Sequence, residues 1–206
     1  MPKIVIIEGA DDYAIAYWFE ARLAAALEVT SGEVAITIPG GSTPFPILDR
    51  LALARLDWSR VAIWPGDDRV VAEDHPASNA GRIRERLEPV GARIVPLTED
   101  ARPPRFVLTW LGMGADGHIA SLFPNTDPRV DDPLPVRRLR PDPLPPEAPF
   151  DRLSLTIPAL LNSDAIAFLI RGAGKRAVFD AAAEGRSDLP VARLLGAATQ
   201  KITCFT

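Results

Sequence analysis

Short apolar runs alternate with longer amphipathic stretches along the chain, and this pattern predicts an α/β fold with a parallel sheet covered by helices. The expected strands are residues 3–8, 33–38, 60–64, 93–97, 106–110, 152–157, 165–170 and 201–206. The run FVLTW, residues 106–110, has no polar face, which is typical of a parallel strand covered on both sides. Helices are therefore expected on both faces of the sheet.

Helical periodicity fills the gaps between several of these runs. Residues 11–27 form one expected helix, capped by Asp11, with apolar side chains on one face: Ile15, Phe19, Leu23 and Leu27. A second helix is expected from Ser78 or Ala77 to Leu87, and a third over residues 189–195. Residues 128–149 are rich in proline and are expected to be irregular or edge structure. The basic residues of that segment are expected to form a solvated strand face: Arg137, Arg138 and Arg140.

Composition narrows the class of protein. With 206 residues, 47% of them hydrophobic, the chain is expected to form one globular domain over residues 1–206. A net charge of −4 gives no general attraction to nucleic acid or to an anionic membrane, so neither partner is expected. The single cysteine, Cys204, excludes an internal disulfide. Neither a signal peptide nor a membrane-spanning run is recognisable, so a cytoplasmic location is expected.

The stretch LGMGADGHIASLFP, residues 111–124, carries the strongest candidate chemistry. It follows the apolar strand 106–110, and loops at the carboxyl ends of parallel strands are where α/β proteins bind ligands. Its glycines permit a tight turn and close approach of a ligand, with Asp116 and His118 inside that turn. The structural alternative is a glycine-rich turn capped by a histidine.

A second glycine-rich loop, PGGSTP, follows the strand 33–38. Gly40 and Gly41 expose backbone amides, and Ser42 and Thr43 add hydroxyls ahead of a helix, so the loop has the outline of a phosphate cradle. The alternative is an ordinary capped turn. A spaced GxGxxG motif does not follow this strand, so the loop implies no nucleotide cofactor.

Cations follow two further strands. Asp67, Asp68 and Arg69 come after the strand 60–64, and Lys175 lies in RGAGK after the strand 165–170. A guanidinium presents paired donors and an ammonium a compact charge, and both suit phosphate. The alternatives are a solvated charge cluster and an ordinary lysine at a helix start. His75 precedes Pro76 in an expected surface loop and is not assigned to the site.

Residues 111–124 resemble the GxGxDGHxASLFP signature of 6-phosphogluconolactonases, within the glucosamine-6-phosphate isomerase/deaminase superfamily. The resemblance continues in order through the GGSTP loop, the DER-like DDR, the SN pair and RGAGK, and it implies a Rossmann-like fold. It implies that His118 is the catalytic base and Asp116 its neighbouring carboxylate. It also implies a set of residues that bind the substrate and its phosphate: Gly40, Gly41, Ser42, Thr43, Asp67, Arg69, Asn79 and Lys175.

The activity implied by this resemblance is hydrolysis of 6-phospho-D-glucono-1,5-lactone to 6-phosphogluconate, a step of the oxidative pentose phosphate pathway. The partner is then a small sugar phosphate lactone, with no cofactor and no metal. Asp116 either orients His118 or braces the turn. Two alternatives remain: a deaminase/isomerase, against which SLFP argues because deaminases carry FNEP-like residues there, and a sugar-phosphate sensor domain, against which the intact His118 argues. A short connector, residues 98–105, and Val107 in place of a common Asp are departures from the family pattern.

Overall fold

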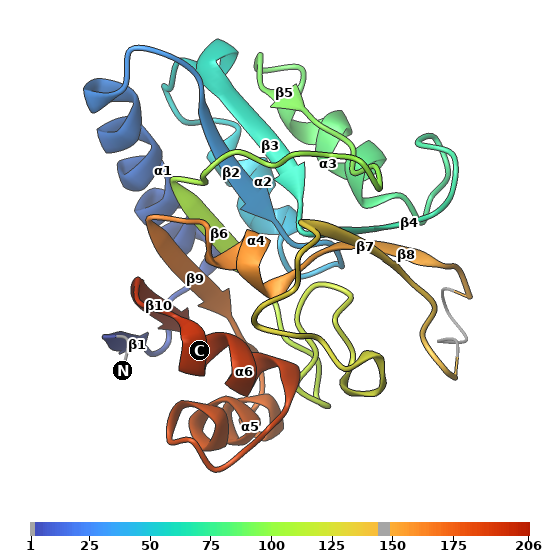
Figure 1. Cartoon of the computed structure of the whole chain (residues 1–206). Helices are drawn as coiled ribbons and strands as arrows, with labels where there is room; N and C mark the ends of the chain where they lie inside the picture. Colours follow the sequence, from blue (N-terminus) through green and yellow to red (C-terminus); the bar gives the residue numbers. More distant parts are fainter. Residues whose placement is uncertain (1–2, 144–148) are drawn as a thin grey trace.

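A seven-stranded parallel sheet forms the centre of the protein (Figure 1). The computed structural model describes residues 3–143 and 149–206. The sheet consists of β1 (Ile4–Ile7), β2 (Val34–Ile38), β3 (Val61–Pro65), β5 (Arg93–Ile94), β6 (Leu108–Leu111), β9 (Ala165–Leu169) and β10 (Lys201–Phe205). The strand order is β1-β10-β9-β6-β2-β3-β5, and neighbouring strands pair in parallel. The predicted mostly parallel sheet is confirmed.

The central strands are buried on both faces, as their apolar sequences predict. Three predicted strands differ from the observed strands by two or more residues at one end. The strand expected at residues 152–157 ends at Leu155, because a helix begins at Ile157. The strand expected at residues 93–97 ends at Ile94, because this edge strand pairs on one side only and Pro96 has no amide to donate. The strand expected from Phe106 begins at Leu108, and Phe106 forms only an isolated bridge with Ser163.

Helices cover both faces of the sheet, as predicted. One face is covered by α1 (Asp12–Val29), α2 (Phe45–Leu51) and α3 (Asn79–Leu87), and the other by α4 (Ile157–Leu161), α5 (Ala173–Ala183) and α6 (Pro190–Ala197). Each face has its own apolar core. Asp11 caps α1 as expected, since its carboxylate accepts a hydrogen bond from the Ala14 amide at 2.8 Å. In the described part of the chain, the helices lack the length and apolar character needed to cross a bilayer.

A second, smaller sheet extends from the carboxyl edge of the first (Figure 1). Its antiparallel strands are β4 (Asp67–Arg69), β8 (Arg152–Leu155) and β7 (Val136–Leu139). The edge strand β7 lies in the proline-rich segment 128–149, of which residues 144–148 are outside the described residues. Its arginines form surface ion pairs, Arg137 with Asp132 and Arg138 with Asp151, as a solvated strand face requires.

The direction of chain growth reverses between β2 and β6. From β2 the chain adds β3 and β5 on one side, and it then returns to add β6, β9 and β10 on the other side. The connections after β2 and β6 therefore leave the sheet in opposite directions and open a crevice at the carboxyl ends of the strands, the usual ligand site of such sheets. Both glycine-rich loops of the sequence begin at this crevice.

Candidate active site

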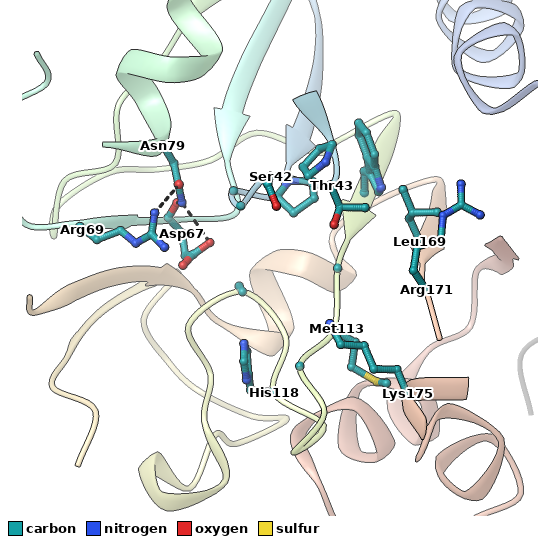
Figure 2. Close-up of a pocket in the computed structure, with 18 residues that line it drawn as sticks. Ser42, Thr43, Asp67, Arg69, Asn79, Met113, His118, Leu169, Arg171 and Lys175 are labelled. Carbon is teal, nitrogen blue, oxygen red and sulfur yellow. Dashed lines mark hydrogen bonds between the residues drawn. The ribbon is translucent and has the colours of Figure 1, made fainter. Parts of the chain in front are cut away.

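A cavity of about 330 Å³ occupies the crevice at the carboxyl ends of four neighbouring strands, β9, β6, β2 and β3 (Figure 2). Residues that follow each of these strands contribute to its wall. The sequence-predicted site residues that line it are Gly40, Gly41, Ser42, Thr43, Asp67, Arg69, Asn79, His118 and Lys175. Asp116 does not line the cavity but contacts His118 directly.

The loop after β6 is held closed by its own backbone. The Gly114 amide donates to the His118 carbonyl at 2.9 Å, and the Gly117 amide donates to the Gly114 carbonyl at 3.1 Å. Gly117 has a φ of +77°, which a side-chain-bearing residue rarely adopts. A Cβ at Gly114 would stand 2.2 Å from the His118 ring, so only glycine leaves room for the imidazole. The local sequence thus fixes where His118 stands.

His118 is paired with Asp116. Its Nδ1 lies 2.6 Å from Oδ1 of Asp116, and its backbone amide donates to the same oxygen at 3.2 Å. The ring also packs on Phe123 at a centroid distance of 4.6 Å. Because an ionised carboxylate only accepts hydrogen bonds, the contact assigns the proton of a neutral ring to Nδ1 and leaves Nε2 as an acceptor. A histidine in this state can take a proton from water.

The GGST loop, defined here as residues 40–43, presents polar groups that the protein itself does not use. The amides and hydroxyls of Ser42 and Thr43, and the amide of Gly41, donate to none of the described residues. Gly41 has a φ of +89°, a conformation that residues with side chains rarely adopt. Lys175, on the first turn of α5, forms no ion pair within residues 3–143 and 149–206, and it also faces the cavity (Figure 2). Amides, hydroxyls and an ammonium of this kind suit an anion.

Asp68 stabilises the structure around the cavity and is not part of its wall. Its buried carboxylate accepts hydrogen bonds from the amides of Arg69, Asn79 and Ala80 at 2.8, 2.6 and 2.9 Å. Burial raises the pKa of Asp68, and these hydrogen bonds only partly offset that effect. Asp68 thereby ties β4 to the start of α3, and it lines no part of the cavity.

Asn79 holds Arg69 against the cavity wall. Its Nδ2 donates to the Asp67 carbonyl at 2.7 Å, and its Oδ1 accepts from Nη1 of Arg69 at 2.8 Å (Figure 2). The Ser121 hydroxyl donates to the Asp67 carboxylate. A Cβ at Gly40 would stand 2.1 Å from Asn79 Nδ2, so Gly40 lets the GGST loop pass over Asn79. Arg69 and Lys175 lie on opposite sides of the cavity in Figure 2.

The sequence reasoning missed two polar residues of the site. Arg171 lines the cavity, and its place two residues after β9, within RGAGK, was the available signal. Its guanidinium already meets the Ala10 carbonyl at 3.1 Å and Asp12 at 3.6 Å. Ser121, in the SLFP segment, reaches Asp67. Within the described ranges, no three His, Cys, Asp or Glu side chains are grouped to hold a metal ion.

The sequence of this chain is similar to those of known proteins. A family model described as glucosamine-6-phosphate isomerases/6-phosphogluconolactonase matches residues 12–102 and 90–204. A 6-phosphogluconolactonase of Pseudomonas putida is 35% identical, with 84% of this chain and 80% of the relative covered. One of Caulobacter vibrioides is also 35% identical, with coverages of 80% and 79%.

Solved structures agree on the fold. The 6-phosphogluconolactonase of Thermotoga maritima superposes with a TM-score of 0.82 at 24% identity, covering 98% of this chain and 99% of that one. The 6-phosphogluconolactonase of Shewanella baltica gives 0.79 at 23% identity, covering 100% and 98%. The resemblance inferred from residues 111–124 is confirmed, and the chain belongs to the glucosamine-6-phosphate isomerase/6-phosphogluconolactonase family.

Proposed function

We propose that the chain hydrolyses 6-phospho-D-glucono-1,5-lactone to 6-phosphogluconate, with water activated by His118. The names of the 35%-identical relatives support the reaction. The observation that carries the mechanism is the His118–Asp116 contact of 2.6 Å on the cavity wall, because it leaves Nε2 of His118 free to accept a proton. Asp116 in this proposal orients the ring and stabilises the imidazolium that forms.

The proposed reaction proceeds in two steps. The oxygen of water bonds to C1 of the lactone while His118 takes a proton from that water, and the carbonyl oxygen becomes an oxyanion. The bond between C1 and the ring oxygen then breaks, and His118 returns the proton to the departing ring oxygen. The product is a carboxylic acid that ionises at neutral pH.

The hydrogen bonds within the loop after β6 exclude some backbone amides as donors to the oxyanion. The amides of Gly114, Gly117 and His118 already donate within the loop, so they do not serve this role. Arg69 lies on the same wall as His118, and its positive charge would stabilise an oxyanion there. We assign the oxyanion to Arg69 and the phosphate to the GGST loop and Lys175.

Replacing His118 with Ala tests the mechanism. The variant is expected to lower kcat by roughly 10²–10⁴, the usual contribution of a positioned general base, with little change in KM. Proton release is measured after subtraction of spontaneous lactone opening. An unchanged kcat, under conditions where chemistry limits turnover, would remove His118 from the role.

Asp116→Asn separates the two roles considered for Asp116. If the carboxylate orients the imidazole, kcat falls while KM and Tm stay near the wild-type values, because Asn accepts a hydrogen bond at one oxygen but carries no charge. If it only braces the turn, Tm falls and the kcat of the folded variant is retained.

A further inference from the structure

A second cavity, of about 580 Å³, adjoins the first, and Lys175 does not line it. The two cavities share Asp67, Arg69, His118 and Ala120 in their walls. His118 therefore stands where they meet. The remaining wall of the second cavity comes largely from the loop before α3, from α3 itself and from the start of β8.

Two arginines of this wall are held directly opposite each other. Arg69 on β4 pairs in register with Arg152 on β8, and both line the second cavity. Like charges at opposed positions of an antiparallel pair destabilise the sheet. Burial, and then the charge of Arg69, lower the pKa of Arg152. The charges of Asp67, Asp68 and Asp151 offset part of this repulsion, and an anion beside the two guanidiniums would offset more of it.

Two more donors complete the basic wall. The Arg82 side chain stacks over the Phe45 ring at 4.0 Å and forms no hydrogen bond or ion pair with the described residues. Nδ1 of His75 accepts the Ala77 amide at 3.0 Å, so the proton of a neutral ring is on Nε2, which makes His75 a donor. Among the described lining residues Asp67 is the one carboxylate.

We infer that the second cavity binds the C1 carboxylate of the hydrolysis product, an inference that rests on the proposed function. With the phosphate at the GGST loop and C1 at His118, the oxygens on C1 face away from the phosphate and toward the arginine wall. Guanidinium groups match the planar geometry of a carboxylate. The two basic cavities thus suit a ligand that is anionic at both ends, a phosphorylated aldonic acid.

This arrangement stabilises the charged states of the reaction at C1. The lactone is uncharged at C1, whereas the tetrahedral intermediate and the product carry negative charge there. A cationic wall at that end binds the charged states more tightly than the substrate, and such differential binding lowers the barrier. The same wall is expected to make the product a competitive inhibitor.

Arg82→Gln tests the inference by titration calorimetry with two inert ligands. One is 6-phosphogluconate, which has a phosphate and a carboxylate, and the other is glucitol 6-phosphate, which has the phosphate alone. The wild type is expected to bind 6-phosphogluconate more tightly. The variant is expected to lose roughly tenfold in affinity for 6-phosphogluconate, the value of one charge-assisted contact, and less than about twofold for glucitol 6-phosphate.

Arg86→Gln is the matched control. Arg86 lies one turn further along α3 and stacks over the same Phe45 ring at 4.3 Å, but it pairs with Asp49 and does not line the cavity. It is expected to leave both affinities unchanged, which separates loss of the anion contact from loss of packing on Phe45.

Three outcomes would overturn the inference. The first is an equal loss for both ligands in Arg82→Gln, which would place the phosphate that they share in the second cavity. The second is no loss for either ligand, and the third is no preference of the wild type for the acid. A wild type that hydrolyses the lactone but gives any of these results overturns only the carboxylate site. A wild type without lactonase activity overturns the proposed function itself.

Discussion

The GGST loop and the cluster around Asp68 stand close to the same cavity, yet their polar groups are satisfied in opposite ways. The loop's amides and hydroxyls have no partner among the described residues. The Asp68 carboxylate, in contrast, accepts three backbone hydrogen bonds and a fourth from the Ser78 hydroxyl at 3.3 Å. Polar groups that are hydrogen-bonded within the protein stabilise the fold, whereas polar groups without protein partners are available to a ligand. Substitutions in the two regions should therefore separate stability from affinity.

The largest expected effect is a loss of stability when Asp68, whose carboxylate has hydrogen-bond partners within the protein, is replaced. Asp68→Ala leaves buried amides at the start of α3 without an acceptor, while it also removes a buried charge. We expect a net loss of about 2 kcal/mol in the free energy of unfolding, measured in denaturant. Ser42→Ala, in the open loop, is the control and should leave that free energy unchanged. Equal losses in the two variants would show that the two regions do not differ in their contribution to stability.

The pH dependence of this loss has a definite sign. Burial raises the pKa of Asp68 in the folded chain above its ordinary value of 3.8. The folded chain then binds more protons than the unfolded one, so ionisation of Asp68 lowers stability as the pH rises from below 3.8 to above the raised pKa. The deficit of Asp68→Ala should therefore be larger below that window than at pH 7. A deficit that grows with pH would contradict this assignment.

The next largest expected effect is on substrate binding by Lys175, which faces the cavity. Lys175→Met removes an ammonium that has no described partner, so stability should be retained. KM for 6-phosphogluconolactone should rise roughly tenfold, while KM for unphosphorylated gluconolactone should change little. Lys201→Met, on the exposed first residue of β10, is the matched control. Equal changes for the two lactones would show that Lys175 does not bind the phosphate.

The smallest effect comes from a pair of threonines. Thr43→Val removes a hydroxyl that no described residue uses and should raise KM for the phosphorylated lactone about two- to threefold without changing Tm. Thr109→Val removes a hydroxyl that donates to the Leu160 carbonyl at 2.9 Å in the core. It should lower stability by about 1 kcal/mol and leave KM unchanged. The reverse pattern would mean that the lack of a hydrogen-bond partner in the protein does not distinguish ligand-binding groups from groups that stabilise the fold.

Much of the fold and of the site could be predicted because both depend on local signals. Buried parallel strands are continuous apolar runs, and the loops that follow them share one edge of the sheet. This is why the sequence brought the GGST loop, His118 and Lys175 to one cavity. The roles of these residues stay predictions, and the activity measurements above test them.

Other features depend on pairing between distant segments, and the sequence carried no local signal for them. Adjacent carboxylates in DDR have different surroundings because β4 is a strand, so Asp67 reaches the cavity while Asp68 turns to α3. The strand β4 exists only because it pairs with β8. The same pairing sets Arg69 opposite Arg152, and with it the second cavity.

Two reactions distinguish a lactonase from a deaminase. Purified wild-type protein is given fresh 6-phosphogluconolactone, with proton release measured, and separately glucosamine-6-phosphate, with ammonia measured. One activated water and a stabilised oxyanion suffice for the first reaction, whereas the second requires ring opening and proton transfer between adjacent carbons. We expect rapid acid release and no ammonia. Ammonia release at a comparable kcat/KM would contradict the lactonase assignment.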